Sequence, residues 1–298
     1  MAGALVVNAD DLGISRGATL GVVRAHQEGV VTSASLAPTG ADYRHALEIC
    51  RSECPELGLG LHFTLSNGRP LSPPDRVPLL VDGRGFMRLR FSSLFRVAGQ
   101  KRRALLAQID IELEAQLQQL RADGVEPDHI DSERHVHLIP AIFEKVIAAA
   151  ERHGIPFVRM GRDIGWQLVR LRHFDPVVLR GGLIKCILLQ ELTRRNRHAT
   201  RKIRASDNFA SYLLSGRLDL VLSSILLDPP RGVTEIMVHP GVPEESRSVD
   251  VGNPGLQHYL GLEDRRRELS ACIRARELAS GLNLCSFGAL AKMNGRHG

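Results

Sequence analysis

The feature that most constrains the fold is a repeated alternation of short apolar runs with longer amphipathic segments. The run 57–65 is nearly continuous in apolar residues, which is typical of a strand buried on both faces of a sheet. The segment 101–123 instead carries apolar residues every three or four positions, which is the spacing of a helix packed on one side. Repeated strand–helix units predict an α/β fold with a parallel sheet, either doubly wound or closed as a barrel.

Two stretches interrupt this alternation, near 66–100 and 161–205, and we predict that both are insertions. The length of 298 residues allows two domains, but single α/β barrels of roughly 250 residues are common. We therefore expect one domain over 1–298. The predicted strands are 5–7, 32–38, 57–65, 127–131, 157–160, 235–239 and 283–286. The predicted helices are 16–29, 42–54, 101–123, 139–153, 176–192, 208–215, 218–226 and 263–280.

The composition excludes several classes of protein. With 43% hydrophobic and 24% charged residues, the chain is expected to be an ordinary soluble globular protein and neither disordered nor collagenous. Five cysteines without a C-x-x-C spacing indicate a reducing compartment rather than a disulfide scaffold. No targeting signal and no run of 18 apolar residues are visible, so we expect a cytoplasmic protein, with the inner surface of the membrane as an alternative.

Polar residues gather where four of the predicted strands end. Asp10 and Asp11 follow the first strand, His62 lies within the third, the run 129–137 covers the end of the fourth, and His239 ends the sixth. The carboxyl ends of parallel strands meet at one rim, where the active sites of such folds lie. We therefore expect these side chains to share one functional site.

The adjacent carboxylates of Asp10 and Asp11 suit a site that activates a metal-bound water. One carboxylate would bind the ion, and the other would take the proton from the water. The alternative is that one of them caps the following helix or turn, because Asp-Leu-Gly is turn-like. The pair in isolation favours neither interpretation.

His62 and His239 each allow two interpretations. His62 interrupts an apolar run, as either a metal ligand or a satisfied core or rim histidine. Gly58 and Gly60 remove side chains beside it, which predicts space for a ligand to approach the backbone. His239 begins the sequence His-Pro-Gly, so it either precedes a simple turn or acts as a general acid at the rim.

The segment after the fourth predicted strand is the most specific of the clusters. Its donors occupy every second position, so an extended backbone would place all of them on one face. Imidazole and carboxylate together suit Zn²⁺, Mn²⁺ or a similar divalent ion, and three or fewer protein ligands leave room for a catalytic water. The alternative is a hydrogen-bonded structural network at the strand end. The donors are His129, Asp131, Glu133, His135 and His137.

Together, the four motifs resemble those of the YdjC-like carbohydrate deacetylases, the group that includes chitooligosaccharide deacetylase. The motifs are Asn-Ala-Asp-Asp-Leu-Gly at 8–13, Gly-Leu-His-Phe-Thr-Leu at 60–65, His-Ile-Asp-Ser-x-x-His-Val-His at 129–137 and Val-His-Pro-Gly at 238–241. The resemblance implies a distorted (β/α) barrel, similar to that of the NodB-like deacetylases. It also implies one divalent metal ion, Mg²⁺ or Zn²⁺, at the rim and hydrolysis of an N-acetyl group on an amino sugar.

The resemblance further assigns roles to single residues. It implies that Asp11 and His62 bind the metal, that Asp10 is the general base, and that His239 protonates the amine leaving group. Many members of the family carry a metal-binding His where this chain has Glu133, so either Glu133 or His135 is expected to take that place. The substitution also raises an alternative function, a catalytically silent carbohydrate- or lipid-binding protein on the same scaffold.

The positive charge is concentrated in one segment. The chain has 39 Lys+Arg and 33 Asp+Glu, a net charge of +6. Residues 159–204 alone contain twelve basic and three acidic residues, a net of +9, which leaves a net of −3 for the rest. A local anionic contact is therefore expected. A nucleic-acid partner is not, because the chain has three Tyr, one Trp and no interleaving of basic with aromatic residues.

The segment 177–204 predicts a peripheral contact with a membrane. Residues 177–192 are strongly apolar, and six basic residues follow by position 204, which is the combination that docking on anionic lipid requires. This interpretation favours a lipid-linked amino sugar as the substrate. The alternative is a core or dimer-interface helix followed by a solvated basic loop, since Gly181 and Gly182 weaken an interfacial helix. A homodimer therefore stays open.

Overall fold

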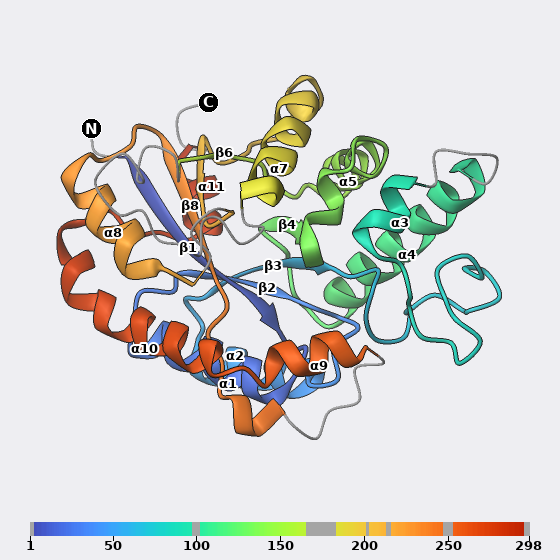
Figure 1. The fold of residues 1–298 in the computed structure, drawn as a ribbon, viewed down its shortest axis with the longest axis horizontal. Coiled ribbons are helices and arrows are strands. Elements are labelled where there is room, and N and C mark those ends of the chain that lie inside the picture. Colours follow the sequence, from blue (N-terminus) through green and yellow to red (C-terminus); the bar gives the residue numbers. More distant parts are fainter. Residues whose placement is uncertain are drawn as a thin grey trace.

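The chain forms an α/β fold built on one parallel sheet. The computed structural model describes residues 3–96, 102–164, 183–200, 203–212, 216–246 and 253–294. Within them, eight parallel strands follow the order β5-β4-β3-β2-β1-β8-β7-β6. The sheet is curled into a half-barrel with helices packed around it (Figure 1). The predicted fold class is therefore confirmed.

The centre of the sheet is the pair of β1 and β8. Val7 lies beside Ile236 and Ala9 beside Val238, so Asp10 and His239, which come next along the two strands, emerge at the same rim. Parallel pairing thus brings together two residues that are far apart in the sequence. The strands are β1 (Ala4–Leu12), β2 (Ser33–Leu36), β3 (Gly58–Phe63), β4 (His129–Ser132), β5 (Phe157–Val158), β6 (Arg162–Asp163), β7 (Asn208–Ala210) and β8 (Val233–Val238).

The helices follow the apolar spacing of the sequence. Along α4, Leu105, Ile109, Leu113, Leu117 and Leu120 are all buried, as their spacing predicts. The α-helices are α1 (Arg16–Gln27), α2 (Tyr43–Glu53), α3 (Phe91–Arg96), α4 (Arg102–Ala122), α5 (Pro140–His153), α7 (Leu183–Asn196), α8 (Leu218–Leu227), α9 (Pro254–Leu260), α10 (Glu263–Leu278) and α11 (Phe287–Asn294). The 3₁₀ segments are η1 (Glu133–Leu138), η3 (Arg197–Thr200), η4 (Pro243–Ser246) and η5 (Ala279–Gly281). No helix among the described ranges is long and apolar enough to cross a membrane.

The start of α1 decides between the two interpretations of the aspartate pair. The cap of this helix is Ser15, whose hydroxyl accepts a hydrogen bond from the backbone N–H of Ala18 at 3.2 Å. Neither Asp10 nor Asp11 caps α1. Both carboxylates are therefore available to the rim of the sheet.

Several predicted elements differ from the structure. The segment 208–215 was expected to be helical, but Asn208–Ala210 is strand β7, and 213–215 lie outside the described residues. This apolar stretch is too short for its period to separate a strand from a helix. The sequence pattern also failed to predict β6, α9 and α11. The expected strand 283–286 contributes one bridge, between Leu284 and Leu5.

The two predicted insertions differ in how much of them the structure describes. The first, near 66–100, is not only loop, because it contains the helix α3 and an antiparallel bridge between Val81 and Met87. The second, near 161–205, contains β6 and α7. Of the apolar helix predicted over 176–192, residues 176–182 lie outside the described residues, and the remainder belongs to α7.

Two buried side chains of α4 hold the start of the first insertion. The Glu112 carboxylate accepts a hydrogen bond from the backbone N–H of Leu71 at 3.0 Å. Gln116 donates to the carbonyl of Thr64 at 2.8 Å and accepts from its N–H at 3.1 Å. Because the backbone after β3 is fixed in this way, Ser66 lies where it can reach the end of β4.

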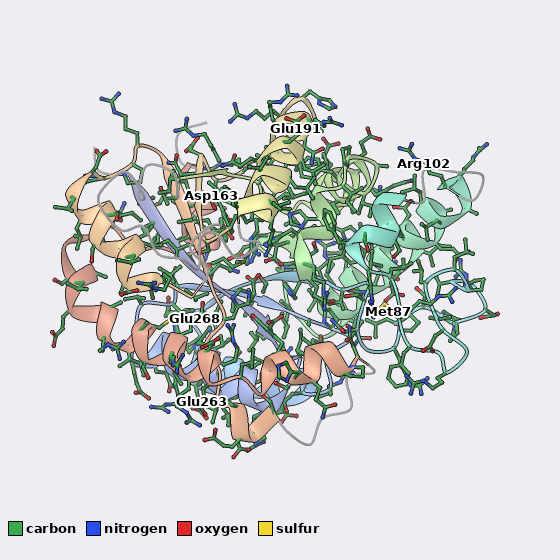
Figure 2. The ribbon with its side chains drawn as sticks, viewed as in Figure 1. Met87, Arg102, Asp163, Glu191, Glu263 and Glu268 are labelled. Carbon is green, nitrogen blue, oxygen red and sulfur yellow. The ribbon has the colours of Figure 1, made fainter. Side chains whose placement is uncertain are left out.

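One face of α10 turns toward the sheet. Glu268 is buried and points inward, whereas Glu263 lies exposed on the same helix (Figure 2). A buried carboxylate needs a cationic partner, and Glu268 finds its partners beside the rim described next.

Candidate metal centre and active-site pocket

The residues predicted for the site converge on one pocket at the carboxyl ends of the strands. The cavity has a volume of about 400 Å³. Lys185, Met237 and Tyr259 contribute to its walls. The six predicted residues that line it are Asp10, Asp11, His62, Glu133, His135 and His239.

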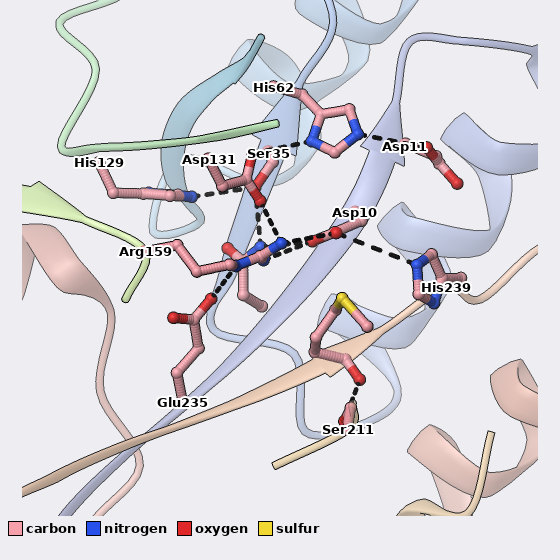
Figure 3. Close-up of polar contacts among 12 residues, drawn as sticks. Asp10, Asp11, Ser35, His62, His129, Asp131, Arg159, Ser211, Glu235 and His239 are labelled. Atoms are coloured by element: carbon pink, nitrogen blue, oxygen red, sulfur yellow. Dashed lines mark hydrogen bonds and ion pairs between the residues drawn. The ribbon is translucent and has the colours of Figure 1, made fainter. Parts of the chain in front are cut away.

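Asp10 lies on the floor of the pocket, where Arg159 holds it. The guanidinium donates to both carboxylate oxygens, at 2.7 and 2.6 Å, and Asn8 Nδ2 donates to Oδ1 at 3.0 Å. Arg159 is itself buried, with Nη1 2.6 Å from Asp131 Oδ2 and Nε 2.7 Å from Glu235 Oε1 (Figure 3). Such a bidentate contact fixes the plane of the Asp10 carboxylate.

One guanidinium therefore serves three buried carboxylates. Burial opposes the charge on Arg159, but Asp10, Asp131 and Glu235 outweigh it and raise the pKa of Arg159 well above its ordinary value. Burial would also raise the pKa of Asp131, yet Arg159 and His62 hold that pKa well below its usual range. For Glu235 burial prevails over Arg159, and its pKa is raised. The pKa values of two carboxylates on the same guanidinium thus move in opposite directions, that of Asp131 downward and that of Glu235 upward.

His62 joins this floor to the open pocket. Its Nδ1 lies 2.8 Å from Asp131 Oδ1, and its Nε2 lies 3.4 Å from Asp11 Oδ1. When Nδ1 donates to Asp131, the lone pair of neutral Nε2 faces Asp11, which is the orientation that carboxylate–histidine pairs provide for metal ions.

The pKa values of His62 and Asp11 reflect the same contact. Burial would lower the pKa of His62, but Asp131, Asp11 and Asp10 raise it well above its ordinary value. Burial would raise the pKa of Asp11, but the hydrogen bond and charge of His62 outweigh it and lower that pKa. The pair thus stabilises a positive charge between Asp11 and Nε2, as either a proton or a bound cation.

The backbone at the end of β1 explains why two adjacent carboxylates face one pocket. Asp11 has a φ of 69°, in the left-handed region that residues other than glycine rarely adopt. The register between β1 and β2 also shifts between Ala9 and Leu12. Regular strand geometry would point Asp10 and Asp11 to opposite faces, and this local turn removes that alternation.

The described residues contain a donor set that could hold a divalent metal ion. Asp10, His62 and Asp131 are buried, and each offers one ligand atom within 4.8 Å of the others. Arg159 contacts both carboxylates of this group, whereas His62 Nε2 is directed at Asp11. A buried Asp/His centre suitable for a divalent ion is therefore present, and its donors leave the choice of ion open.

The extended backbone predicted for 129–137 is wrong. Strand β4 ends at Ser132, and η1 follows, in which Arg134 and His135 have left-handed φ angles of 53° and 57°. The left-handed conformation is unfavourable for non-glycine residues, by roughly 1–2 kcal/mol each. The sequence of this segment therefore did not predict two such residues in succession. The donors of this segment therefore do not share one face.

Two of these donors belong to a structural network. His129 Nε2 lies 3.0 Å from Ser35 Oγ. His137 Nδ1 lies 2.6 Å from Ser132 Oγ, and its Nε2 lies 2.9 Å from the carbonyl oxygen of Arg159. Burial lowers the pKa of His137 to about 4, so its ring is neutral at pH 7. His129 and His137 thus belong to a hydrogen-bonded structural network at the strand end, which was the alternative to metal binding.

Glu133 and His135 both reach the pocket, with different surroundings. Glu133 Oε2 accepts a hydrogen bond from Ser66 Oγ at 2.6 Å, and Oε1 accepts from Arg134 Nε at 3.2 Å. The ring of His135 is buried, and its Nδ1 has no hydrogen-bond partner among the described residues. Burial, reinforced by Lys185, lowers the pKa of His135 well below its ordinary value. His135 is therefore a neutral imidazole with a lone pair to offer.

His239 faces Asp10 across the pocket. Its Nε2 lies 4.0 Å from Asp10 Oδ2 (Figure 3). Its Nδ1 lies 3.8 Å from Glu268 Oε1 on α10. Arg265 Nη1 lies 3.1 Å from Glu268 Oε2 and donates to the carbonyl of His239 at 3.1 Å. Burial would raise the pKa of Glu268, but His239 and Arg265 outweigh it and lower that pKa. A charged carboxylate is thus held behind the imidazole.

Comparison with known proteins places this geometry in a family. A model of the family described as YdjC-like protein matches residues 4–279. The chain belongs to the YdjC-like family. This confirms the resemblance that the four motifs indicated.

Relatives of this YdjC-like chain carry related names. It is 43% identical over 152 residues to the carbohydrate deacetylase of Brevibacillus brevis, which is 51% of this chain and 57% of that protein. It is 40% identical over 163 residues to the chitooligosaccharide deacetylase of Proteus mirabilis, covering 54% and 60% of the two chains. The matched stretch therefore spans little more than half the length of these relatives.

A solved structure shares the fold. The crystal structure of a proposed cellobiose-phosphate cleavage protein from Enterococcus faecalis matches this YdjC-like chain with a TM-score of 0.70. The match covers 97% of this chain and 99% of the other, at 23% sequence identity. The likeness supports the half-barrel architecture.

Sequence analysis of this YdjC-like chain missed three residues of the site. Arg159 was counted only as one of the basic residues of 159–204, for which an anionic contact was expected, and it was not assigned to the site; its anionic partners are the buried carboxylates of the floor. A signal was present, because Arg159 and Glu235 each lie in a predicted buried strand, and buried charges must be paired. Glu268 gave no such signal, since it lies in a helix with many charged residues.

The glycines beside His62 have a different use from the predicted one. A Cβ on Gly60 would lie 2.3 Å from the ring of His129, and a Cβ on Gly58 would lie 2.7 Å from Asp128 Oδ2. The space that they leave is filled by the protein's own side chains. The prediction that this space admits a ligand is therefore wrong.

Proposed function

We propose that this YdjC-like protein is a metal-dependent hydrolase that removes the N-acetyl group of an amino sugar, in an oligosaccharide or a lipid-linked glycan. The observation that carries the proposal is that the two adjacent aspartates have different partners. Asp10 is clamped by Arg159 and faces His239, whereas Asp11 faces His62. The names of the relatives, carbohydrate deacetylase and chitooligosaccharide deacetylase, support this substrate class.

Asp11 and His62 would hold the ion, the latter through Nε2. A cation between Asp10 and Asp131 would instead meet the guanidinium of Arg159, which lies within hydrogen-bonding distance of both carboxylates. In this arrangement Asp131 does not bind the ion but orients the ring of His62 through the contact with Nδ1. The unpartnered Nδ1 of His135 and the carboxylate of Glu133 are the two candidates for a third ligand.

The identity of the third ligand bears on the identity of the ion. Asp11 and Glu133 with one imidazole form an oxygen-rich set that suits Mg²⁺, whereas Asp11 with His62 and His135 suits Zn²⁺. When bound, the ion would polarise the acetyl carbonyl and lower the pKa of a bound water.

The proton transfers fall to Asp10 and His239. Asp10 takes the proton of the attacking water, and its carboxylate plane is fixed for this task by the two hydrogen bonds from Arg159. His239 gives a proton to the departing amine, with Glu268 behind it as an anchor. The two groups lie 4.0 Å apart, so both can reach the atoms of one bound amide.

A catalytically silent carbohydrate- or lipid-binding protein is the second candidate. The observation that favours it is the state of Glu133, both of whose oxygens already have partners in Ser66 and Arg134. If neither Glu133 nor His135 binds the ion, Asp11 and His62 alone would hold it weakly.

We also propose that residues 1–298 form a single domain in the cytoplasm. The pairing of β1 with β8 joins residues 4–9 to residues 233–238 in one sheet, and the family model spans 4–279. The proposed single domain is therefore consistent with both observations.

The test is release of acetate from N-acetylated chitooligosaccharides, with the metal content of the purified protein measured on the same sample. We expect turnover that a chelator abolishes and that Mg²⁺ or Zn²⁺ restores. Binding of the glycan without acetate release would favour the silent protein. A metal-free protein that stays inactive after either ion is added, beside an active reference deacetylase, would refute the proposal.

A further inference from the structure

Helix α7 carries an exposed stripe that the proposed chemistry does not use. The side chains of Cys186, Leu189 and Thr193 pack inward. Each outward position lies three or four residues from at least one other, which places them on one side of the helix. We call them the α7 stripe, and they are Ile184, Ile187, Leu188, Glu191, Arg194 and Arg195.

The first half of the α7 stripe is apolar and exposed. Ile184, Ile187 and Leu188 are 75%, 56% and 37% exposed. Other large apolar side chains that are exposed among the described residues, such as Leu227 and Leu278, lie on other helices. Three aliphatic side chains within little more than one turn form a patch, and exposed apolar patches of this kind mark interaction surfaces.

The second half of the α7 stripe is basic. The side chains of Arg194 and Arg195 are 70% and 59% exposed, and both contact the single carboxylate of Glu191, so a net positive charge remains. Arg102, at the start of α4, lines the same cavity as Arg195, a largely aliphatic space of about 260 Å³. Figure 2 shows Glu191 and Arg102 at the same upper edge of the molecule. Basic side chains of two helices thus lie together at the C-terminal end of the α7 stripe.

We propose that the α7 stripe docks on a lipid bilayer that contains anionic lipid. Ile184, Ile187 and Leu188 insert among the acyl chains, and Arg195 and Arg102 contact phosphate oxygens at the surface. The net positive charge of Arg194, Arg195 and Arg102 beside exposed aliphatic side chains is complementary to an anionic bilayer, which is why we assign the stripe to a membrane surface. The described part of the segment 177–204, for which the sequence predicts a membrane contact, supplies this surface, and residues 177–182 and 201–202 lie outside it.

Docking would also place the bilayer beside the pocket. Lys185, on the same helix as the α7 stripe, lines the wall of the active-site cavity. The inference itself does not rest on the proposed function, because vesicle binding is measured without any substrate.

The test is sedimentation of the full chain with vesicles of phosphatidylcholine alone or with about one third phosphatidylglycerol. We expect binding to the anionic vesicles only, and weaker binding at moderate than at low salt, because salt screens the arginines. The double variant Ile184→Ser with Ile187→Ser should lower the partition coefficient by about tenfold or more. Arg102→Glu with Arg195→Glu should abolish the preference for anionic vesicles.

Matched controls separate docking from a general loss of folding. Leu227→Ser removes an apolar side chain that is 76% exposed on α8, and Arg267→Glu reverses a charge on α10 whose side chain is 79% exposed. Both controls should bind like the wild type, and circular dichroism should show all variants folded. No binding to anionic vesicles at either salt, or an equal loss in variants and controls, would overturn the proposal. So would a wild-type dimer that the Ile184/Ile187 variant dissociates, because a second copy would then cover the stripe.

Discussion

Two regions of the pocket contain the same kinds of residues but differ in whether these residues already have partners. We call them the floor, where carboxylates contact Arg159, and the wall, which carries Asp11, His62 and His135. On the floor, Asp10, Asp131 and Glu235 share the guanidinium of Arg159, which holds all three carboxylates in place. On the wall, Asp11 faces His62 at 3.4 Å, and His135 keeps an unpartnered nitrogen. The difference shows that the position of one cation decides which carboxylates are fixed in place and which are left to bind something.

Charge compensation gives this difference a physical basis. A buried carboxylate without a partner is costly, so the floor needs Arg159 simply to fold. Asp11 instead contacts the imidazole of His62, and the lowered pKa of Asp11 together with the raised pKa of His62 indicates that a positive charge belongs between them. A divalent ion would supply that charge. Substitutions at matched positions on the floor and the wall therefore test whether the floor residues are held by Arg159 and the wall residues bind the ion.

The largest effect is expected from exchanging the two neighbouring aspartates one at a time for asparagine. Asp10→Asn should lower kcat by about 10²–10⁴-fold, the range for loss of a general base, while the metal content stays at the wild-type level. Asp11→Asn should lower both activity and metal content. Acetate release and elemental analysis on each variant measure the two. If both variants lost the metal equally, Asp10 would be a ligand and the separation of floor and wall would fail.

The next effect concerns stability and tests the floor alone. Arg159→Met leaves three carboxylates without their cation and should lower the free energy of unfolding by about 3–5 kcal/mol. Arg267→Met removes an exposed pairing with Asp264 and should change it by less than about 0.5 kcal/mol. Urea denaturation of both variants gives the comparison. A stability loss at Arg159 no larger than that at Arg267 would show that the floor is solvated and not closed.

The sequence predicted the parts of this site that follow from regular strands. Asp10, His62 and His239 lie at or near the ends of β1, β3 and β8, where buried parallel strands meet at one rim, and the pocket contains all three. Glu133 and His135 also reach it, but not by the extended backbone that was expected. The fold class was predictable for the same reason, since strand–helix alternation leaves few other architectures.

What escaped prediction depends on contacts between distant segments. The left-handed backbone at Asp11, Arg134 and His135 is imposed by packing, because no glycine at these positions signals it. Glu268 reaches His239 only because α10, which packs against α1 and α8, passes beside the segment that follows β8, and its own helix gives no sign of that contact. The sequence shows which residues are polar, but it does not show which cation each carboxylate contacts in the folded chain.

A smaller effect is expected at the third ligand of the wall. If His135 binds the ion, His135→Ala should weaken metal affinity by at least about 10–100-fold, the cost of losing even an outer partner of a metal ligand, whereas Glu133→Gln should leave it nearly unchanged. If Glu133 binds the ion instead, Glu133→Gln should weaken metal affinity and His135→Ala should leave it nearly unchanged. Titration of the metal-free variants with Zn²⁺ and Mg²⁺ measures both affinities. Unchanged affinity in both variants would place the ion elsewhere and favour the silent protein.

The smallest effect is expected behind His239, where the contact is long. Glu268 Oε1 lies 3.8 Å from Nδ1, which is beyond a normal hydrogen bond, so Glu268→Gln should lower kcat by only about three- to tenfold, with KM and metal content unchanged. Glu263→Gln, on the exposed face of the same helix, should have no effect. A purely structural role for Glu268 would lower the free energy of unfolding and leave kcat of the folded enzyme intact. A positioning role would do the reverse, because removing the anchor frees the imidazole to rotate while Arg265 keeps its contacts with the carbonyl of His239 and the hydroxyl of Tyr259.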